Sequence, residues 1–410
     1  MIYDVIVVGG GPSGATAAED LARAGKCVAL LDRAGRIKPC GGAVPPRLIQ
    51  DFDIPDSQIV ARINTARMIS PTGRAVDIAI ENGYVGMVDR EHFDAFLRDR
   101  AVAAGAELIT GTFTAIERDA GGTHVAYRDK ASGEPLRLTG RLVIGADGAR
   151  SNVARAEVPG GDTIPYVIAY HEIIAAPPTT ADYDPTRCDV IYDGRISPDF
   201  YGWVFPHGAQ ASVGMGTGLD GVDLKQATAD LRASSGLTGC ETIRREGAPI
   251  PLKPLDKWDN GRDVVLAGDA AGVVAPSSGE GIYYAMVGGR VAATAALACL
   301  ASGRAADLAL ARKLFMKEHK TVFRVLRSMQ DAYYKSDERR ERFVSLCHDR
   351  DVQRLCNLNF ENEVAFVACE GPRENAQIVA EWLEQDSRVD YVTWPGLKSS
   401  PYYHLGQKIT

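Results

Sequence analysis

Three glycines near the N-terminus have the spacing of a phosphate-binding turn. Gly9, Gly11 and Gly14 form the pattern GxGxxG, in which small residues let the backbone turn tightly and approach a pyrophosphate. Eighteen residues beyond Gly14, Asp32 offers a carboxylate that can accept hydrogen bonds from ribose hydroxyls. This spacing predicts a nucleotide cofactor. A glycine-rich turn without a ligand is the alternative that the motif alone leaves open.

The elements around these residues must bring them together. Residues 2–8, IYDVIVV, are a β-branched run typical of a buried strand, and residues 15–24 are helix formers that stop at Gly25. Residues 28–31 predict a second strand that ends at Asp32. This order of strand, turn, helix and strand directs a helix N-terminus at the phosphates of the cofactor.

Two later segments repeat this arrangement. Residues 142–155, LVIGADGARSNVAR, and residues 264–281, VVLAGDAAGVVAPSSGEG, are apolar strands that run into glycine and aspartate. Asp269 at a strand end can accept a hydrogen bond from a cofactor hydroxyl. Gly279 and Gly281 allow close backbone approach and precede a helix whose N-terminus favours negative charge. Each aspartate could instead cap a helix, which is its commoner role when it stands alone.

The order GGGPSG, GADGARS and GDAAG resembles the flavin monooxygenase and reductase superfamily. The resemblance implies a mixed α/β fold, in which a Rossmann-like FAD-binding domain is interrupted by an antiparallel-sheet substrate domain and followed by a helical C-terminal part. The FAD-binding domain is expected at 1–75, 85–160 and 260–305, and the substrate domain at 76–84 and 161–259. A helical segment at 306–350 and an atypical tail at 351–410 complete the expected organisation.

A longer resemblance points to one family. Residues 38–46, KPCGGAVPP, the stretch YVGMVDREHFDAFLRDRA, and PDFYGWVFP at 198–206 resemble the geranylgeranyl reductases of chlorophyll and bacteriochlorophyll synthesis, with the last matching their PxxYxWxFP pattern. The resemblance implies an oxidoreductase in which NADPH reduces FAD, and the flavin reduces isolated double bonds of a geranylgeranyl diphosphate or pigment ester to the phytyl form. There is no second clear GxGxxG, so NADPH rests on analogy. The alternatives are a prenyl reductase of quinones or ether lipids, an aromatic flavin hydroxylase, and a flavoprotein without turnover.

The same resemblance implies cofactor contacts, residue by residue. The residues expected to contact FAD are Asp32, Cys40, Gly41, Arg90, Ala115, Asp269, Gly281 and Ile282. Arg90 opens the helical pattern REHFDAFLRDRA, from which its guanidinium could reach cofactor oxygens, and an ordinary solvated arginine is the alternative. Cys40 could be a small residue in a tight turn, a proton donor or a redox thiol, and we favour packing. It is the one candidate for a catalytic residue.

Three aromatic residues alternate along one predicted strand in the PxxYxWxFP segment. Tyr201, Trp203 and Phe205 therefore project from one face, where they could wall an apolar channel for a long isoprenoid substrate. On the pattern alone, an aromatic face of the protein core is the alternative.

Size and composition limit the other possibilities. At 410 residues the chain exceeds the size at which one core usually stops growing, and its net charge of −7 argues against a nucleic-acid binder. Eight cysteines form no CxxC pair and no zinc-ligand spacing, so we expect no metal and a reduced, cytoplasmic environment. The first strand begins at residue 2, so no signal peptide is expected. The apolar stretch 291–301 is about half the ~20 residues that span a bilayer and predicts a buried helix.

Residues 311–342 predict a basic amphipathic helix. This stretch holds ten Lys or Arg and five Asp or Glu. Its apolar stripe consists of Phe315, Val322, Leu326, Met329 and Tyr333. Such a helix could bind peripherally to an anionic photosynthetic membrane, whereas packing on the protein with a solvated basic face is the favoured alternative.

The last part of the chain departs from the reductase pattern at about Cys356. Residues 374–408, ENAQIVAEWLEQDSRVDYVTWPGLKSSPYYHLGQK, resemble a fragment of the pyridoxal-phosphate enzymes of cysteine and methionine metabolism. Because no cofactor lysine with its surrounding motif is evident, we expect this fragment to bind no pyridoxal phosphate.

Overall fold

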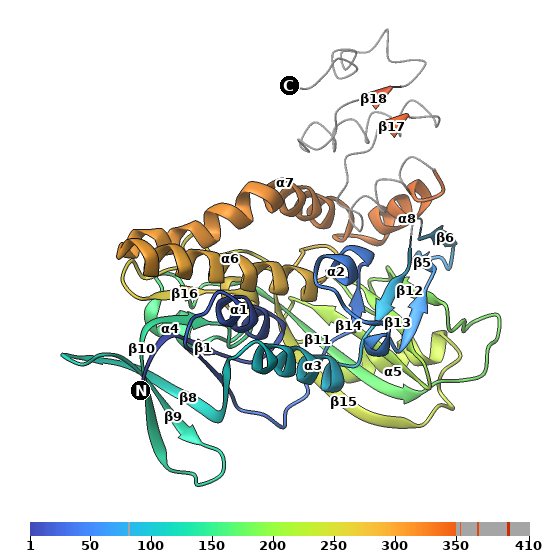
Figure 1. Cartoon of the computed structure of the whole chain (residues 1–410). Coiled ribbons are helices and arrows are strands. Elements are labelled where there is room, and N and C mark those ends of the chain that lie inside the picture. The colour runs from blue at the N-terminus through green and yellow to red at the C-terminus, as the bar shows by residue number, and fades with distance from the viewer. Residues whose placement is uncertain (81–82, 350–352, 354–366, 369–391, 394–410) are drawn as a thin grey trace. The chain divides into compact units, whose positions relative to one another are not determined.

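The computed structural model describes residues 1–80, 83–349, 353, 367–368 and 392–393, and its mixed α/β class confirms the predicted one (Figure 1). The chain divides into two compact units, each discontinuous in sequence. The first contains Met1–Cys40, Arg90–Val167 and Ala248–Lys320. The second contains Gly41–Asp89, Ile168–Gly247 and the chain from Thr321 onward. Residues 41–75, which we expected with the FAD-binding segments, thus lie in the second unit.

The first unit is built on a six-stranded sheet. Its order is β1-β2-β8-β9-β10-β16, and β1 also pairs with β10. The strands are β1 Ile2–Val8, β2 Val28–Asp32, β8 Glu107–Asp119, β9 Gly122–Asp129, β10 Pro135–Gly145 and β16 Val264–Leu266. β1 pairs in parallel with β2 and β10, and β10 pairs in parallel with β16, whereas β9 is antiparallel to β8 and β10. The carboxyl ends of β1, β2, β10 and β16 therefore lie at the same edge.

Helical segments complete the first unit. They are α1 Pro12–Arg23, α3 Arg90–Ala103, α4 Asn152–Glu157, η2 Gly268–Ala271, α6 Ile282–Ser302, η3 Ala305–Ala309 and the first part of α7 Leu310–Tyr333. Helix α1 lies between α3 and α6 (Figure 1). The α1–α6 contact is so close that a Cβ at Gly289 would stand 2.1 Å from the Ser13 carbonyl oxygen.

Helix α6 contains the apolar stretch for which we predicted a buried helix. Within the described part of the chain, it is the one helix long and apolar enough to cross a membrane, and 50% of its apolar window is buried inside the protein. Burial of that kind is what a core helix of a soluble protein also shows.

The second unit is built on a seven-stranded sheet of order β15-β11-β14-β13-β12-β5-β6. The strands are β5 Thr65–Ile69, β6 Ala75–Ala79, β11 Tyr166–Ala175, β12 Arg187–Ile191, β13 Gly202–His207, β14 Gln210–Thr217 and β15 Thr242–Pro251. Neighbours pair antiparallel from β11 through β14 and β13 to β12, and again between β5 and β6, whereas β12 and β5 are parallel. A core around Val213, Met215 and Leu231 packs under helix α5 Leu224–Ser234.

Smaller elements complete the second unit. A three-stranded antiparallel sheet joins β3 Ala43–Val44, β7 Val85–Met87 and β4 Ala61–Ile63. The short helices are α2 Pro46–Asp51, η1 Asp56–Gln58 and α8 Asp337–Leu346. Strands β17 Val367–Ala368 and β18 Val392–Thr393 pair in parallel. Apart from β18, the fragment that resembles pyridoxal-phosphate enzymes lies outside the described residues.

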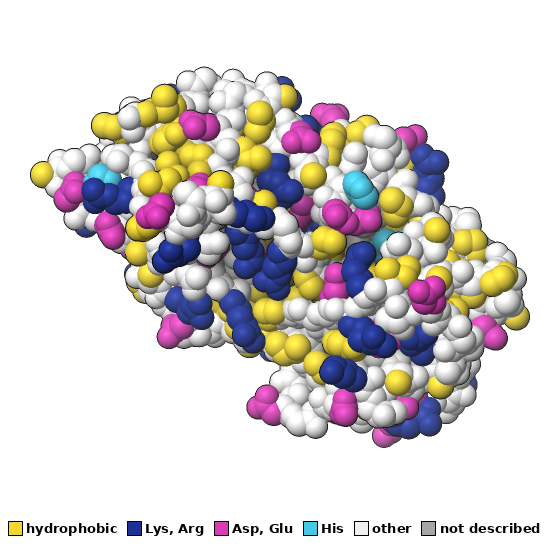
Figure 2. Space-filling model, turned by 90° about the horizontal axis from the view of Figure 1, so that it is seen from below, with side chains coloured by type: hydrophobic (Ala, Val, Ile, Leu, Met, Phe, Trp, Pro, Cys, Tyr) yellow, Lys and Arg dark blue, Asp and Glu magenta, His cyan; other side chains and the backbone are white. Residues whose placement is uncertain are grey.

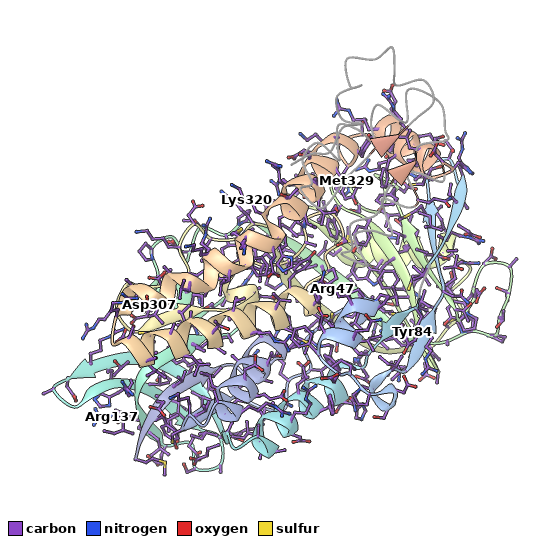
Figure 3. All side chains as sticks on the ribbon, turned by 45° about the horizontal axis from the view of Figure 1, so that its top comes forward. Arg47, Tyr84, Arg137, Asp307, Lys320 and Met329 are labelled. Atoms are coloured by element: carbon purple, nitrogen blue, oxygen red, sulfur yellow. The ribbon has the colours of Figure 1, made fainter. Side chains whose placement is uncertain are left out.

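The predicted apolar stripe lies on α7, whereas the predicted basic stretch 311–342 continues past the end of α7 into α8. Most of the stripe is buried, and Tyr333 is half-buried. Phe315, Val322, Leu326 and Met329 are buried, whereas Lys320 on the same helix is exposed (Figure 3). Burial of the apolar side chains with an exposed basic face is the alternative that we favoured over membrane contact. Binding of a membrane through 311–342 stays a prediction, and it would have to use the charged face.

The surface seen in Figure 2 is mixed in character. Basic, acidic and hydrophobic side chains are interspersed there, so the described residues on this face form no surface of a single charge sign.

Candidate functional site

The glycine turn after β1 leaves open space at one position. A Cβ at Gly9, where φ is +106°, would stand 2.3 Å from the Ala146 carbonyl oxygen, and a Cβ at Gly14 would stand 1.8 Å from the Gly9 carbonyl oxygen. Gly11 has no atom within 4 Å of such a Cβ, and no side chain caps helix α1 at this residue. Two glycines thus permit close packing, and the third leaves room for a phosphate at the uncapped helix N-terminus. The turn therefore fits the pyrophosphate of a dinucleotide.

Asp32 at the end of β2 holds this turn. Its Oδ2 accepts a hydrogen bond from the Gly10 backbone N–H at 2.8 Å, and its Oδ1 accepts from the Ala34 N–H at 2.8 Å. From helix α3, the Arg98 guanidinium donates to the Gly10 carbonyl oxygen at 3.1 Å. Both backbone polar groups of Gly10 are therefore hydrogen-bonded, and Arg98 is a contributor that the sequence did not single out.

Asp269 follows β16 and is paired with a lysine. Its side chain is buried, with the residue 8% exposed, and its Oδ2 accepts a hydrogen bond from the Lys38 ammonium. A Cβ at Gly281 would stand 3.9 Å from Asp269 Oδ1, and Ile282 begins helix α6 immediately after Gly281. The structure thus brings together three predicted cofactor residues and adds Lys38, whose loop position carries no periodic signal.

Glu280 is an unpredicted carboxylate at the start of α6. Its Oε1 accepts a hydrogen bond from the Tyr283 backbone N–H at 2.8 Å, whereas its Oε2 is buried without a hydrogen-bond partner among the described residues. Burial, reinforced by the charge of Asp269, raises the pKa of Glu280 to about 7, although the N–H groups of the helix oppose this shift. A carboxylate directly before a predicted helix start was the signal in the sequence.

Asp147, in the second of the three repeated segments, accepts from the first N–H groups of α4, whose N-cap residue is Ser151. Its carboxylate accepts from the Asn152 N–H at 2.7 Å, from the Val153 N–H at 3.2 Å and from the Ser151 hydroxyl, and Ser151 Oγ accepts from the Ala154 N–H. Burial nevertheless raises its pKa. The capping alternative thus describes this aspartate, whereas Asp269 bonds a lysine instead.

Arg90 is buried, so the solvated alternative for this residue is wrong. The residue is 5% exposed, and its guanidinium donates to both carboxylate oxygens of Asp94, one turn along α3, at 2.7 and 2.8 Å. Burial alone would lower the pKa of Arg90, but the charge of Asp94 and the contact with Cys40 outweigh it, and the pKa rises. The (i, i+4) spacing of Arg90 and Asp94 is readable in the sequence. Contact of Arg90 and Cys40 with FAD stays a prediction.

Ala115 lies in a different setting. It is half-buried in the antiparallel β8–β9 ladder, where the register shifts between Phe113 and Ala115. A register shift bends the strand locally. A cofactor contact there stays a prediction.

The aromatic row of the second unit lies on one side of β13. The ring centroids of Tyr201 and Trp203 are 6.1 Å apart, and those of Trp203 and Phe205 are 6.2 Å apart. The Trp203 indole N–H donates to Ser212 Oγ at 3.0 Å, and His171 Nδ1 lies 2.8 Å from the same oxygen. This chain of contacts fixes the orientation of the central ring.

The glycines after Cys40 pack against this row. A Cβ at Gly41 would stand 3.2 Å from Phe205 Cδ2, and a Cβ at Gly42, where φ is +73°, would stand 2.4 Å from His207 Nε2. His207 Nδ1–H donates to the Phe205 carbonyl oxygen at 3.0 Å, and burial lowers the pKa of His207 to about 4. A neutral histidine and two glycines therefore pack at the Phe205 end of the row. The role of Cys40, which precedes these glycines, stays a prediction.

Metal and disulfide chemistry find no support in the described part of the chain. Its His, Cys, Asp and Glu side chains form no group of three that could hold a metal ion. The cysteines at 27, 40, 188, 240, 299 and 347 are not joined by disulfides.

Comparison with known proteins identifies relatives over most of the chain. Residues 4–350 match the family model described as "Lycopene cyclase protein". The chain is 70% identical over 363 residues to geranylgeranyl diphosphate reductase of Rhodobacter capsulatus, covering 88% of this chain and 92% of that protein. It is 40% identical over 370 residues to the chloroplastic geranylgeranyl diphosphate reductase of Oryza sativa subsp. japonica, covering 86% and 79%.

A solved structure has the same fold. A geranylgeranyl bacteriochlorophyll reductase-like protein from Thermoplasma acidophilum superposes with a TM-score of 0.80, covering 93% of this chain and 98% of that chain. At 22% sequence identity, this likeness concerns the fold alone.

Proposed function

Because the chain belongs to the family of geranylgeranyl diphosphate reductases, we propose that it reduces isolated carbon–carbon double bonds of a geranylgeranyl chain with electrons from NADPH. The family and its flavin-dependent relatives support FAD as the bound cofactor. FAD, when bound, supplies two-electron reduction of an alkene that has no activating group. The product would carry the phytyl chain used in chlorophyll or bacteriochlorophyll synthesis.

The observation that carries this proposal is the aromatic row. Tyr201, Trp203 and Phe205 stand side by side at centroid distances near 6 Å, and Tyr201 and Trp203 are buried. An isoprenoid tail is apolar along its whole length, and aromatic rings are a surface that it can pack against without charged partners. This row matches the PxxYxWxFP pattern that distinguishes the family in sequence.

The cofactor would be held by the first unit. We assign the pyrophosphate to the open space at Gly11 and the N-terminus of α1, and a ribose to Asp32. Asp269 with Lys38, and the start of α6 at Gly281 and Ile282, would contact the flavin portion.

The other cofactor contacts that the sequence predicts belong to the same proposal. Arg90 holds Cys40 and Asp94 in place, so these residues would shape the wall beside the cofactor. Cys40 stays a candidate proton donor, and Gly41 would leave room between the turn and Phe205. We propose that the enzyme works in the cytoplasm or bound peripherally to the photosynthetic membrane.

Mass spectrometry of the prenyl chain tests the function. FAD-loaded protein is incubated anaerobically with NADPH and either geranylgeranyl diphosphate or geranylgeranylated pigment. A gain of two hydrogens, or of a multiple of two, is expected. The better substrate identifies the head group. The Gly11→Ala variant is the matched control, because it should fold but lose FAD.

Two results would reject the proposal. Bleaching of the flavin by NADPH with an unchanged prenyl chain would exclude these substrates. NADPH-dependent oxygen consumption that needs an aromatic substrate would instead indicate a hydroxylase. NADH in place of NADPH, at equal protein concentration, tests the choice of nicotinamide.

A further inference from the structure

A buried arginine in helix α8 reaches the loop that precedes the aromatic row. Arg340 is 2% exposed, and its guanidinium donates to the carbonyl oxygens of Ser197 (at 3.3 Å), Pro198 and Tyr334 and to Asp337 Oδ1 (at 2.6 Å). Nη1 donates to Asp337, and Nη2, which has two N–H groups, is shared among the three carbonyl oxygens, whereas a lysine ammonium offers one point charge. Pro198 is the first residue of the segment PDFYGWVFP, and Ser197 directly precedes it.

The loop closes tightly around this cation, so a side chain at Gly194 would have to displace the Arg340 and Asp337 side chains. The Gly194 N–H donates to Asp337 Oδ1 at 2.9 Å, and a Cβ at Gly194 would stand 2.7 Å from both Arg340 Nη1 and Asp337 Oδ1. The Ser197 hydroxyl donates to the Gly216 carbonyl oxygen at 2.7 Å, and its oxygen accepts from the Phe200 N–H at 3.0 Å. The loop therefore depends on α8 on one side and on β14 on the other.

Contacts between aromatic rings connect Tyr334 to Tyr201, the first residue of the aromatic row. Tyr334 lies 5.4 Å from Tyr192 and 6.4 Å from Phe200, measured between ring centroids. Phe200 stacks on Tyr201 at 4.3 Å with an interplanar angle of 25°. Phe343 of α8 also meets Tyr192 edge-on at 5.2 Å. The end of α7 and helix α8 thus contact both the backbone and the rings that set the position of Tyr201.

Helix α8 has a second attachment that does not involve Arg340. Glu341 accepts a hydrogen bond from the Thr72 hydroxyl at 2.9 Å and lies 3.4 Å from Arg74, in the turn between β5 and β6 (Figure 1). Substitution of Arg340 should therefore loosen the loop without releasing the helix. This makes the role of Arg340 separable from folding.

We propose that Arg340 is a positioning residue that fixes the Ser197 and Pro198 backbone, and through it Tyr201, so that α8 determines how the isoprenoid chain is seated and how many of its double bonds are reduced. This inference rests on the proposed function, because it takes the aromatic row as the substrate wall. Arg340 acts through Tyr201 and does not itself contact substrate. The residues that hold the loop, Tyr334, Asp337, Arg340 and Phe343, come before the point at which the chain departs from the reductase pattern.

Arg340→Lys tests the proposal, with Arg342→Lys, an exposed position in the same helix, as the matched control. Hydrogen–deuterium exchange of peptides that cover 193–201 should show lost protection in Arg340→Lys and none in the control. The KM for the prenyl substrate should rise on the order of tenfold, because hydrogen bonds to a charged group are lost. Partly reduced chains should accumulate, while flavin content and the rate of flavin bleaching by NADPH stay unchanged. Asp337→Asn, which keeps the arginine, should give a weaker version of the same pattern.

The outcomes are distinct. Protection of 193–201 and KM both unchanged in Arg340→Lys would overturn the proposal. Loss of protection throughout the chain in both Arg340→Lys and Asp337→Asn would make Arg340 a general stability residue and would also overturn it. If the wild-type protein leaves the prenyl chain unaltered, the proposed function fails, and the local exchange result still reports whether Arg340 orders the loop.

Discussion

The backbone N–H of Gly10 donates a hydrogen bond to Oδ2 of Asp32 at 2.8 Å, which ties the glycine turn to the end of the second strand. The other carboxylate oxygen accepts from the Ala34 N–H. A carboxylate has about four lone-pair sites, so acceptor capacity remains for ribose hydroxyls. Asp32 therefore shapes the turn, and we predict that its remaining acceptor sites bind a ribose of the cofactor.

Asp32→Asn should weaken flavin binding. An amide has one acceptor oxygen, so its NH₂ group would face either the Gly10 or the Ala34 N–H. A lost hydrogen bond to a charged group costs roughly 1.5–3 kcal/mol, so the Kd for FAD should rise by about 10- to 100-fold. Titration of flavin-free protein with FAD measures this Kd. The exposed Asp99→Asn on α3 is the control, and an unaltered Kd in Asp32→Asn would contradict the assigned role.

Gly11→Ala and Gly14→Ala should fail in different ways. At Gly11 φ is −76° and the space is open, so alanine fits and the fold persists, but its methyl group takes the place of a phosphate oxygen. At Gly14 the methyl group would lie 1.8 Å from the Gly9 carbonyl oxygen, so the turn itself must break.

Thermal unfolding and flavin content separate the two variants. Gly11→Ala should keep the Tm of the flavin-free protein and lose FAD. Gly14→Ala should lose stability by about 1–3 kcal/mol or more, as overpacked sites do. Equal Tm values for the two variants would show that the turn is looser than described.

Elements with a regular pattern were predictable from the sequence, because their signal is local. The β-branched run 2–8 is β1, the helix predicted at 15–24 is α1 at Pro12–Arg23, and the alternating aromatic residues do lie side by side. The fold class and family also followed from motifs whose order along the chain is fixed.

Pairings between distant segments were not predictable. Lys38 meets Asp269 across 231 positions of sequence, and no periodicity relates a loop lysine to a strand-end aspartate. Likewise, Asp147 and Asp269 are not distinguished by the sequence, since both follow an apolar strand and a glycine. In the structure, Asp147 accepts from backbone N–H groups of α4, whereas Asp269 accepts from Lys38.

Ser212→Ala should disturb the aromatic row. Ser212 Oγ accepts the indole N–H of Trp203 and lies 2.8 Å from His171 Nδ1, all in buried positions. Removing the hydroxyl leaves a buried N–H unsatisfied, which costs about 1–3 kcal/mol. Chemical denaturation measures this loss, and the KM for the prenyl substrate should rise while flavin content stays constant. The exposed Ser328→Ala is the control. Unchanged stability and KM in Ser212→Ala would show that the orientation of Trp203 does not depend on this hydrogen bond.

The sign of the pH effect at Glu280 follows from its raised pKa. In the unfolded chain this carboxyl has its ordinary value of 4.5, whereas burial raises the native pKa to about 7. Between these two values the native state binds more protons than the unfolded state, so stability falls as pH rises. The favourable contribution is complete below pH 4.5 and is lost as pH passes through about 7.

Glu280→Gln should therefore stabilise the flavin-free protein more at pH 8 than at pH 5. Glutamine keeps an oxygen for the Tyr283 N–H but carries no charge to desolvate, so the gain in the free energy of unfolding should be larger at pH 8 by about 2–3 kcal/mol. Denaturant unfolding at the two pH values measures it, with the exposed Glu134→Gln as the control for removing a surface carboxylate. A gain that is equal at both pH values would mean that the buried carboxyl titrates as it does in the unfolded chain. A larger gain at pH 5 would reverse the sign and place Glu280 in a site that favours its charged form.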